Sequence, residues 1–279
     1  MQKEIYENSY KNKKHFSFGK NWQNFLKTLT DEKIEEAKKS LVEFLGGMDR
    51  IKNKTFVDIG CGSGLFSLVA IKLGASKVVS VDVDDFSMAC VRHLREKENN
   101  PESWKIKKGS ALDKNFINSL GQFDSVYSWG VLHHTGEMYK AFDNVKNLIK
   151  PDGYFYLAIY NKNTKCKLEG TSEFWLKAKK IYNESSNVVK KIMELIYSGY
   201  FILGLLANFK NPISYIKNYQ TTRGMNFFTD IKDWLGGYPY EYASVQEIKD
   251  YFKKYNLLCE KNTEVRSIGC NEYLFRKVL

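Results

Sequence analysis

Two acidic side chains stand at the ends of apolar runs, where they could bind cations and hydroxyl groups. Asp58 precedes three glycines at alternate positions, Gly60, Gly62 and Gly64, and Asp82 ends a second apolar run about twenty residues later. A carboxylate can pair with a cationic amine, and its two oxygens can accept hydrogen bonds from two neighbouring hydroxyls. The spacing G-x-G-x-G differs from the G-x-G-x-x-G that seats a pyrophosphate on a helix. The motif therefore favours a ligand that has an amine and lacks a phosphate.

Two adjacent histidines, His133 and His134, follow a third apolar stretch, residues 123–129. A histidine has an ordinary pKa near 6.5 and could remove a proton from a hydroxyl or an amine. Successive residues point to different sides of the chain, so we expect at most one of the pair to act as a base. The alternative is that both histidines fix the loop through hydrogen bonds.

The elements that must position these residues indicate an α/β fold. An apolar strand, a glycine turn and a helix with apolar residues at helical spacing form the first unit of a doubly wound sheet. Ligands of such sheets bind beyond the carboxyl ends of the strands, so the loops after Ile59, Val81 and Trp129 should share one rim. The expected strands cover residues 55–59, 77–82, 104–108, 123–129, 154–160, 257–265 and 271–276.

The run Asp58-x-Gly60-x-Gly62-x-Gly64 resembles the first motif of class I methyltransferases that use S-adenosylmethionine. The resemblance implies a Rossmann-like, seven-stranded mixed sheet whose last strand is antiparallel. It also implies that Asp58 holds the methionine ammonium and that Asp82 holds the ribose. Ser110 stands where related enzymes commonly place an Asp against the adenine. The residues expected at the cofactor are Asp58, Gly60, Cys61, Gly62, Gly64, Asp82, Val83, Ser110, Ala111 and Trp129.

The resemblance extends over nearly the whole chain. A Phe-Gly-x-Asn-Trp arm (residues 18–22), Trp-Gly-Val-Leu-His-His-Thr (129–135) and Asp-Trp-Leu-Gly-Gly-Tyr-Pro-Tyr-Glu (233–241) resemble one group of this family, often labelled by analogy with quinone-biosynthesis methylases. The arm either closes over the cofactor or acceptor as a flap, or packs against the sheet edge. We expect three parts: residues 1–50 as arm and helix, residues 51–161 and 257–279 as the cofactor-binding core, and residues 162–256 as a helical lid.

The lid contains about ninety residues, a length that requires structure of its own. Its most apolar run, residues 192–207, is too short for a membrane span and contains Glu194. We favour a helix buried in the lid, with a dimer face or a membrane-surface contact as alternatives. A membrane contact predicts vesicle association that charges at Ile202 and Leu205 abolish.

A second part of the lid combines glycines, aromatic residues, a proline and charges, which suggests an acceptor site in a loop. The alternative is an ordered loop in which Arg223 pairs with Asp233 or Glu241. The residues expected at the acceptor are Arg223, Asp233, Tyr238, Tyr240 and Glu241.

Composition narrows the class of protein without naming a substrate. The formal net charge is +11, which favours nucleic acid, anionic membranes or phosphate-bearing acceptors, although scattered lysines on solvated faces explain it equally well. Five widely spaced cysteines predict neither a disulfide framework nor a zinc site and fit a reducing cytoplasm. We expect no metal, because no ligand cluster has metal-binding spacing.

The sequence thus predicts methyl transfer from S-adenosylmethionine to an oxygen or nitrogen of a small polar acceptor, such as a sugar or a phosphorylated metabolite. The alternatives are RNA methylation, quinone or lipid O-methylation, and a non-catalytic partner that only binds the cofactor. A homodimer is compatible with all of these.

Overall fold

The structure is a computed structural model that describes residues 19–165, 169–223 and 226–278, without the side chains of residues 19–21, 24 and 220–223. Phe18 of the predicted arm and the side chain of Arg223 lie outside the described part.

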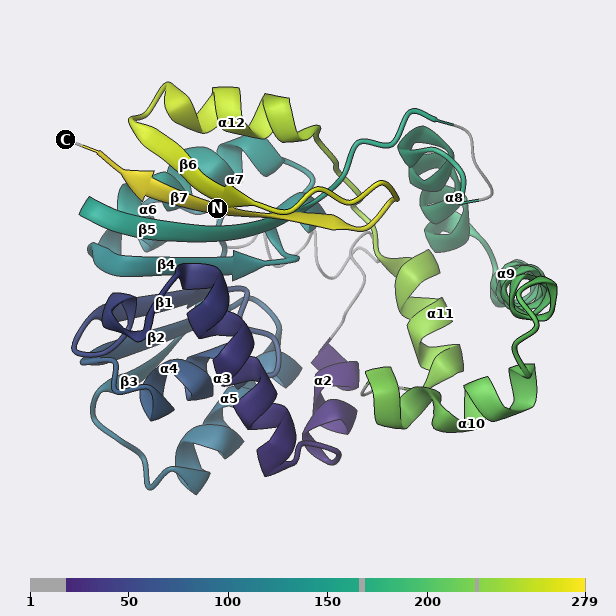
Figure 1. Cartoon of the computed structure of the whole chain (residues 1–279), viewed down its shortest axis with the longest axis horizontal. Helices are drawn as coiled ribbons and strands as arrows, with labels where there is room; N and C mark the ends of the chain where they lie inside the picture. The colour runs from purple at the N-terminus through teal and green to yellow at the C-terminus, as the bar shows by residue number, and fades with distance from the viewer. Residues whose placement is uncertain (1–18, 166–168, 224–225, 279) are drawn as a thin grey trace.

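A seven-stranded sheet forms the centre of the molecule (Figure 1). Its strand order is β3-β2-β1-β4-β5-β7-β6. Neighbouring strands from β3 to β5 are parallel, whereas β7 runs antiparallel to both β5 and β6. This topology confirms the predicted mixed sheet with an antiparallel last strand. The strands are β1 Thr55–Ile59, β2 Lys77–Asp82, β3 Trp104–Lys108, β4 Phe123–Trp129, β5 Ile149–Tyr160, β6 Leu257–Asn262 and β7 Cys270–Lys277.

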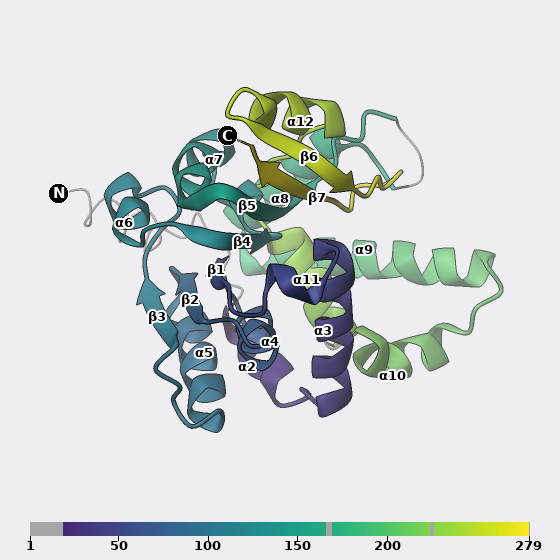
Figure 2. The ribbon, with the colours of Figure 1, turned by 60° about the vertical axis from the view of Figure 1, so that its left-hand side comes forward.

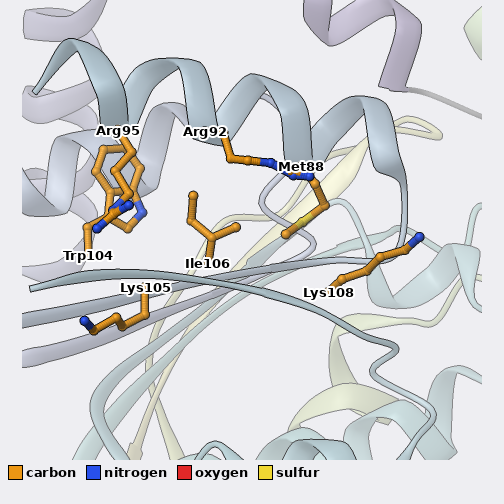
Figure 3. Close-up of a pocket in the computed structure, with 7 residues that line it drawn as sticks. All are labelled: Met88, Arg92, Arg95, Trp104, Lys105, Ile106 and Lys108. Carbon is orange, nitrogen blue, oxygen red and sulfur yellow. The ribbon is translucent and has the colours of Figure 1, made fainter. Parts of the chain in front are cut away.

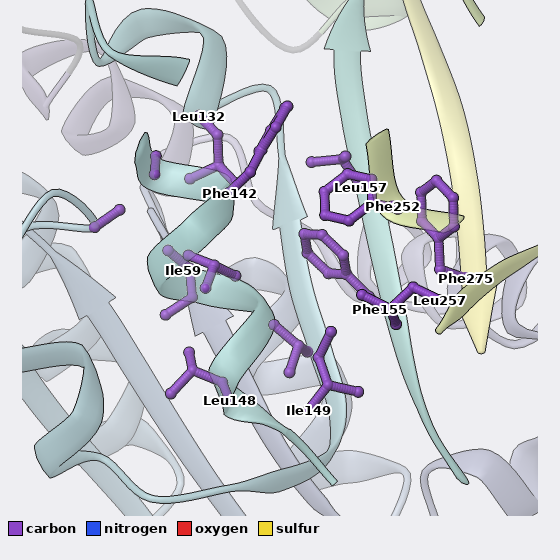
Figure 4. Close-up of a cluster of buried hydrophobic side chains, with 14 of the residues drawn as sticks. Ile59, Leu132, Phe142, Leu148, Ile149, Phe155, Leu157, Phe252, Leu257 and Phe275 are labelled. Carbon is purple, nitrogen blue, oxygen red and sulfur yellow. The ribbon is translucent and has the colours of Figure 1, made fainter. Parts of the chain in front are cut away.

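Helices cover both faces of the sheet, and each face has its own apolar core. One face packs against α3 (Asp31–Leu45), α4 (Leu65–Lys72) and α5 (Asp85–Lys97) (Figure 1). The other packs against α6 (Lys114–Ser119), α7 (Met138–Val145) and α12 (Val245–Lys253). Figure 4 shows side chains of this second core that lie between the sheet and its helices. Strands buried on both faces account for their nearly continuous apolar sequence.

Four helices form the lid beyond the carboxyl ends of the strands (Figures 1 and 2). They are α8 (Ser172–Glu184), α9 (Asn187–Ala207), α10 (Pro212–Arg223) and α11 (Phe227–Gly236). The lid has a separate core, made of Trp175, Tyr182, Tyr219, Phe227, Ile231, Leu235 and Tyr240.

The structure corrects three local predictions and gives one element that the sequence left open. Residues 233–236 belong to α11 rather than to a loop, because Leu235 packs in the lid core. Part of the arm is a helix, α2 (Gly19–Leu26). Helix α12 packs on the sheet through Ile248 and Phe252, so the range 162–256 is too long for the lid. Only Ser198 and Leu205 of α9 are buried, which contradicts a helix buried in the lid.

Candidate active site

The three glycines of the turn after β1 all adopt backbone angles that favour glycine. Gly60, Gly62 and Gly64 have φ values of +74°, +53° and +83°. A Cβ atom on Gly60 would lie 2.3 Å from Cγ1 of Val131, in the loop after β4. The loops after β1 and β4 therefore touch, as the shared rim predicts.

Asp82, at the end of β2, is joined to the glycine turn. Its Oδ2 accepts a hydrogen bond from the Gly62 N–H at 3.0 Å, and its Oδ1 accepts one from the Asp84 N–H at 2.9 Å. Burial raises the pKa of Asp82 to about 6, although these hydrogen bonds oppose the shift. Asp84 is the N-cap of α5. The carboxylate of Asp82 thus lies at the rim between β1 and β2.

Asp58 ends a buried chain of hydrogen bonds that crosses three strands and a helix. The indole N–H of Trp104 donates to Ser80 Oγ at 2.8 Å, and Ser80 donates to Ser67 Oγ at 2.6 Å. Ser67 in turn donates to Asp58 Oδ2 at 2.7 Å. Only 2% of Asp58 is exposed, and this burial raises its pKa to about 7. This chain of hydrogen bonds fixes the orientation of the Asp58 carboxylate through its Oδ2 atom.

The two carboxylates present a site that fits a cationic ligand with hydroxyl groups. Both pKa values are raised mainly by burial, and the charge of Asp82 adds to the shift of Asp58. A cation near both groups would favour their ionised forms. Because Gly60 and Gly62 have no Cβ atoms, Val131 and Trp22 pack directly against the turn beside the two carboxylates.

Helix α2 covers this turn. A Cβ atom on Gly62 would lie 2.9 Å from the indole ring of Trp22. Trp22 therefore lies against the glycine turn.

The other residues expected at the cofactor lie around the same rim. Ser110 follows β3, and its Oγ accepts a hydrogen bond from the Leu112 N–H at 3.1 Å. Trp129 is 46% exposed at the end of β4 and donates its indole N–H to Glu272 at 2.7 Å. Cys61 and Ala111 are each 8% exposed, and Val83 is half-buried. Burial raises the pKa of the Cys61 thiol well above its ordinary value, so it is not a thiolate.

The two histidines after β4 have different surroundings. His133 is fully buried, and its Nδ1 accepts a hydrogen bond from the Tyr160 N–H at 3.2 Å. Burial lowers the pKa of His133 well below its ordinary value, so it stays neutral. His134 is half-buried, with Nδ1 2.6 Å from the carbonyl oxygen of Pro239. That carbonyl can only accept a hydrogen bond, so Nδ1 carries the proton and Nε2 is the basic nitrogen.

An aromatic cluster joins the histidines to the lid. The ring of Tyr160 lies 4.1 Å from that of His133 and 4.9 Å from that of Tyr240, centroid to centroid. Trp234 packs edge-on against Tyr160 at 5.9 Å. The His133 Nε2 and the Trp234 Nε1 are buried without a hydrogen-bond partner among the described residues. Buried polar atoms normally have partners, so this cluster can offer hydrogen bonds to a bound acceptor.

Lys179 of α8 belongs to the same cluster and was not among the predicted site residues. It is fully buried, its Nζ donates to the carbonyl oxygen of Trp234, and it lies 3.9 Å above the Trp234 ring. Burial lowers its pKa to about 7. The sequence did contain a signal, because Lys179 lies at helical spacing between Trp175 and Tyr182, within the buried face of α8.

The predicted acceptor residues are only partly brought together. Glu241 accepts from the Met138 N–H with both carboxylate oxygens, at 3.0 and 3.1 Å, and so caps the N-terminus of α7. Asp233 lies on α11, near enough to Lys179 to influence its charge. Tyr240 is buried in the lid core, and Tyr238 is half-buried beside Pro239. Glu241 therefore has a structural contact that the sequence did not indicate.

A basic hollow of about 380 Å³ lies on another surface, between α5 and β3 (Figure 3). Arg92, Arg95, Lys105 and Lys108 line it. Arg95 donates to the carbonyl oxygens of residues 100 and 101, and Lys108 pairs with Asp85 at 2.7 Å. Two of the four cations are thus already engaged within the chain.

Among the described residues, no group of three or more His, Cys, Asp or Glu side chains could hold a metal ion. Within that same part of the chain the cysteines Cys61, Cys90, Cys259 and Cys270 are unpaired, and Cys166 lies outside it.

Comparisons with known proteins agree with this geometry. Residues 57–157 match the family model of a methyltransferase domain. The ribosomal protein L11 methyltransferase of Tolumonas auensis is 30% identical over 112 residues, which cover 40% of this chain and 35% of that protein. The chain spans between 14% and 35% of the length of such curated relatives.

Two solved structures share the fold. Magnesium protoporphyrin IX methyltransferase from Synechocystis, solved with bound SAH, has a TM-score of 0.52 at 14% identity, over 87% of this chain and 82% of that one. An S-adenosylmethionine dependent methyltransferase from Mesorhizobium loti has a TM-score of 0.51 at 13% identity, over 86% and 97% of the two chains. These likenesses confirm the predicted fold.

Proposed function

We propose that this chain, an enzyme with the class I methyltransferase fold and S-adenosylmethionine as its cofactor, methylates an oxygen or nitrogen of a small polar acceptor. The observation that carries the proposal is the pair of acids at the ends of adjacent parallel strands. Asp58 and Asp82 flank the glycine turn, and both have pKa values raised by burial. Asp58 binds the cofactor ammonium, and Asp82 binds the ribose hydroxyls.

The bound cofactor supplies an electrophilic methyl group. His134 receives the acceptor's proton at Nε2, because its Nδ1 donates to the Pro239 carbonyl. His133 is not the base, since it is fully buried and its Nδ1 already accepts the Tyr160 N–H. His133 instead holds the loop, and its backbone oxygen accepts the Glu241 N–H at 2.9 Å. Orientation of the acceptor against the methyl group contributes the rest of the rate.

The acceptor binds beneath the lid, between the His134 loop and the aromatic cluster. Tyr160, Trp234 and Tyr240 can pack against a ring. The unsatisfied Trp234 Nε1 and His133 Nε2 can bind its hydroxyls. Lys179 adds a group that can carry a positive charge near a sugar or phosphate oxygen. The Pro239 carbonyl contacts His134, so the segment that follows α11 lies against the proposed base, an arrangement suited to a small acceptor.

The basic hollow gives RNA little support, because Arg95 and Lys108 are engaged within the chain. The L11 methyltransferases are named for a protein substrate, which gives a reason to test a protein acceptor. Quinones and lipids are further acceptors that the labelling experiment can detect.

The test incubates the protein with methyl-labelled S-adenosylmethionine and fractionated extract, alongside the His134→Gln variant. Label in the small-molecule or polysaccharide fraction, lost in the variant, supports the proposal. Label that is sensitive to nuclease, sensitive to protease or extractable into organic solvent would show instead that the acceptor is RNA, protein or lipid, respectively. Cofactor binding without label in any fraction would contradict catalysis by this chain.

A further inference from the structure

The outward face of α9 is apolar and uncovered by any described part of the chain. Its side chains recur every three or four residues and so form one stripe along the helix. The stripe consists of Val188, Ile192, Leu195, Ile196, Leu203 and Leu206, which are between 49% and 71% exposed. Contiguous exposed apolar side chains of this kind mark interaction surfaces in folded proteins.

The opposite face of α9 already completes the lid. Met193, Tyr197 and Phe201 pack against the lid core, and Leu205 is only 8% exposed. The outward stripe is therefore not needed for the fold of the lid. It also follows that Leu205, chosen from the sequence as a contact residue, lies on the wrong face for an external partner.

The turn that follows α9 ends the stripe with an exposed aromatic residue. Phe209 is 100% exposed and has a φ of +54°, which a bulky residue rarely adopts. Ile213, in the first turn of α10, is 68% exposed beside it. Figure 2 shows α9 projecting from the body and α10 folding back beneath it. The tip of this α9–α10 hairpin (residues 187–223) thus presents apolar side chains.

The charges of the hairpin are almost all positive. Residues 186–219 contain four lysines and one carboxylate, Glu194. Glu194 accepts a hydrogen bond from the Tyr182 hydroxyl at 2.7 Å, which holds it toward the lid. Lys191 and Lys210 are exposed, one near the stripe and one at the tip. The exposed surface therefore combines apolar side chains with positive charge.

We propose that the α9–α10 hairpin docks in the plane of an anionic membrane surface. Apolar side chains of the stripe enter the boundary between headgroups and acyl chains, while the lysines pair with anionic headgroups. No single described helix is long and apolar enough to span a membrane; α9 with residues 212–219 passes that test only as a pair bent by 119°. A second copy of the chain fits less well, because a symmetric contact would bring the same lysines together.

Vesicle flotation of the full chain tests this docking and needs no methyl transfer. The wild type should float with phosphatidylcholine vesicles that contain phosphatidylglycerol, and much less with phosphatidylcholine alone. The variant Leu203→Gln/Leu206→Gln should bind at least about tenfold more weakly. Lys191→Gln and Lys210→Gln should each lower binding about fivefold at low salt. Phe209→Gly removes the tip residue at a position whose backbone angle suits glycine, so it should lose binding without unfolding.

Matched controls change similar residues elsewhere. Leu258, 45% exposed on β6, and the exposed Lys54 can each be replaced by Gln, and neither change should alter flotation. Flotation that survives the stripe and tip substitutions would overturn the proposal. A wild type that does not float would also overturn it. Sedimentation velocity would then show whether the stripe is a dimer face, because Leu203→Gln/Leu206→Gln would abolish such dimers.

Discussion

The rim of the sheet buries an ionisable side chain, whereas the α9–α10 hairpin exposes apolar side chains. At the rim, the carboxylate of Asp58 is buried, and a chain of hydroxyl and indole groups holds it in place. On the hairpin, Leu203 and Phe209 are exposed with no covering element in the described chain. The rim thus buries a group that can carry charge, whereas the hairpin exposes apolar side chains.

The difference teaches that the kind of partner can be inferred from the group that raises the free energy of the unbound protein in each region. A buried carboxylate without a cation is costly because charges lose solvation in the interior. An exposed apolar stripe is costly because water solvates it poorly. If the rim is a cation site, its ligand affinity and its effect on stability should not depend on the hairpin.

The largest effect is expected at His134. His134→Gln removes the basic nitrogen, so we expect turnover to fall between about 10² and 10⁴-fold with cofactor affinity unchanged. Rates should be measured with the acceptor identified by labelling, over a range of pH. Turnover within a factor of two of the wild type would remove His134 from the mechanism.

Asp58→Asn should separate affinity from stability. Asparagine keeps the shape and can still accept the hydrogen bond of Ser67, but it cannot pair with an ammonium group. We expect cofactor affinity to fall about 100-fold, because hydrogen bonds to charged groups are the stronger ones. The free protein should become about 2 to 4 kcal/mol more stable at pH 8, since an unpaired buried carboxylate is removed. Leu203→Gln on the hairpin should leave both quantities nearly unchanged.

Calorimetry and urea denaturation measure the two quantities. A loss of stability in Asp58→Asn without loss of affinity would mean that Asp58 is a structural residue.

Cofactor binding should weaken as the pH falls. The ionised acids bind the cation, and the pKa values of Asp58 and Asp82 are about 7 and about 6. Affinity should fall about tenfold between pH 7 and pH 6, and more steeply below pH 6. The stability of the free protein should change in the opposite direction. In the folded state the two acids stay protonated up to pH 6 to 7, whereas in the unfolded chain they lose their protons at about pH 4. The free energy of unfolding should therefore decrease as the pH rises from about 4 to 7. Affinity independent of pH from 5 to 8 would contradict these ionisations.

A smaller effect is expected from a pair of glycine substitutions. Gly62→Ala and Gly121→Ala both place a Cβ at a positive φ, +53° and +81°, which costs about 1 kcal/mol of stability in each case. Only Gly62→Ala also meets a neighbour, the Trp22 ring, whereas Gly121 has open space around it. We expect about a tenfold loss of cofactor affinity in Gly62→Ala alone. Equal affinities of the two variants would show that Trp22 and the turn do not form the site.

The sequence was sufficient for the rim because the rim is built from local patterns. The strand before Asp58, the alternate glycines and the acid at Asp82 each follow from short-range spacing, and the loops meet because parallel strands end at one edge.

The lid was harder to predict because its contacts are long-range. Glu241 caps a helix about a hundred residues away in sequence, and Lys179 is buried by α11 as well as by its own helix. The run 192–207 is apolar on both faces of α9, so periodicity alone could not show which face the lid covers. Glycines within 233–237 suggested a loop, but Leu235 and its packing extend α11 to Gly236.

The most direct test of the cofactor site is a calorimetric titration of S-adenosylmethionine into the wild type and Asp82→Ala at pH 8, with circular dichroism to verify folding. Alanine leaves the Gly62 N–H without its partner and removes both oxygens that bind the ribose diol. We predict a folded variant whose affinity is about 100-fold lower than that of the wild type. A folded variant with wild-type affinity would contradict the central claim that this rim holds the cofactor.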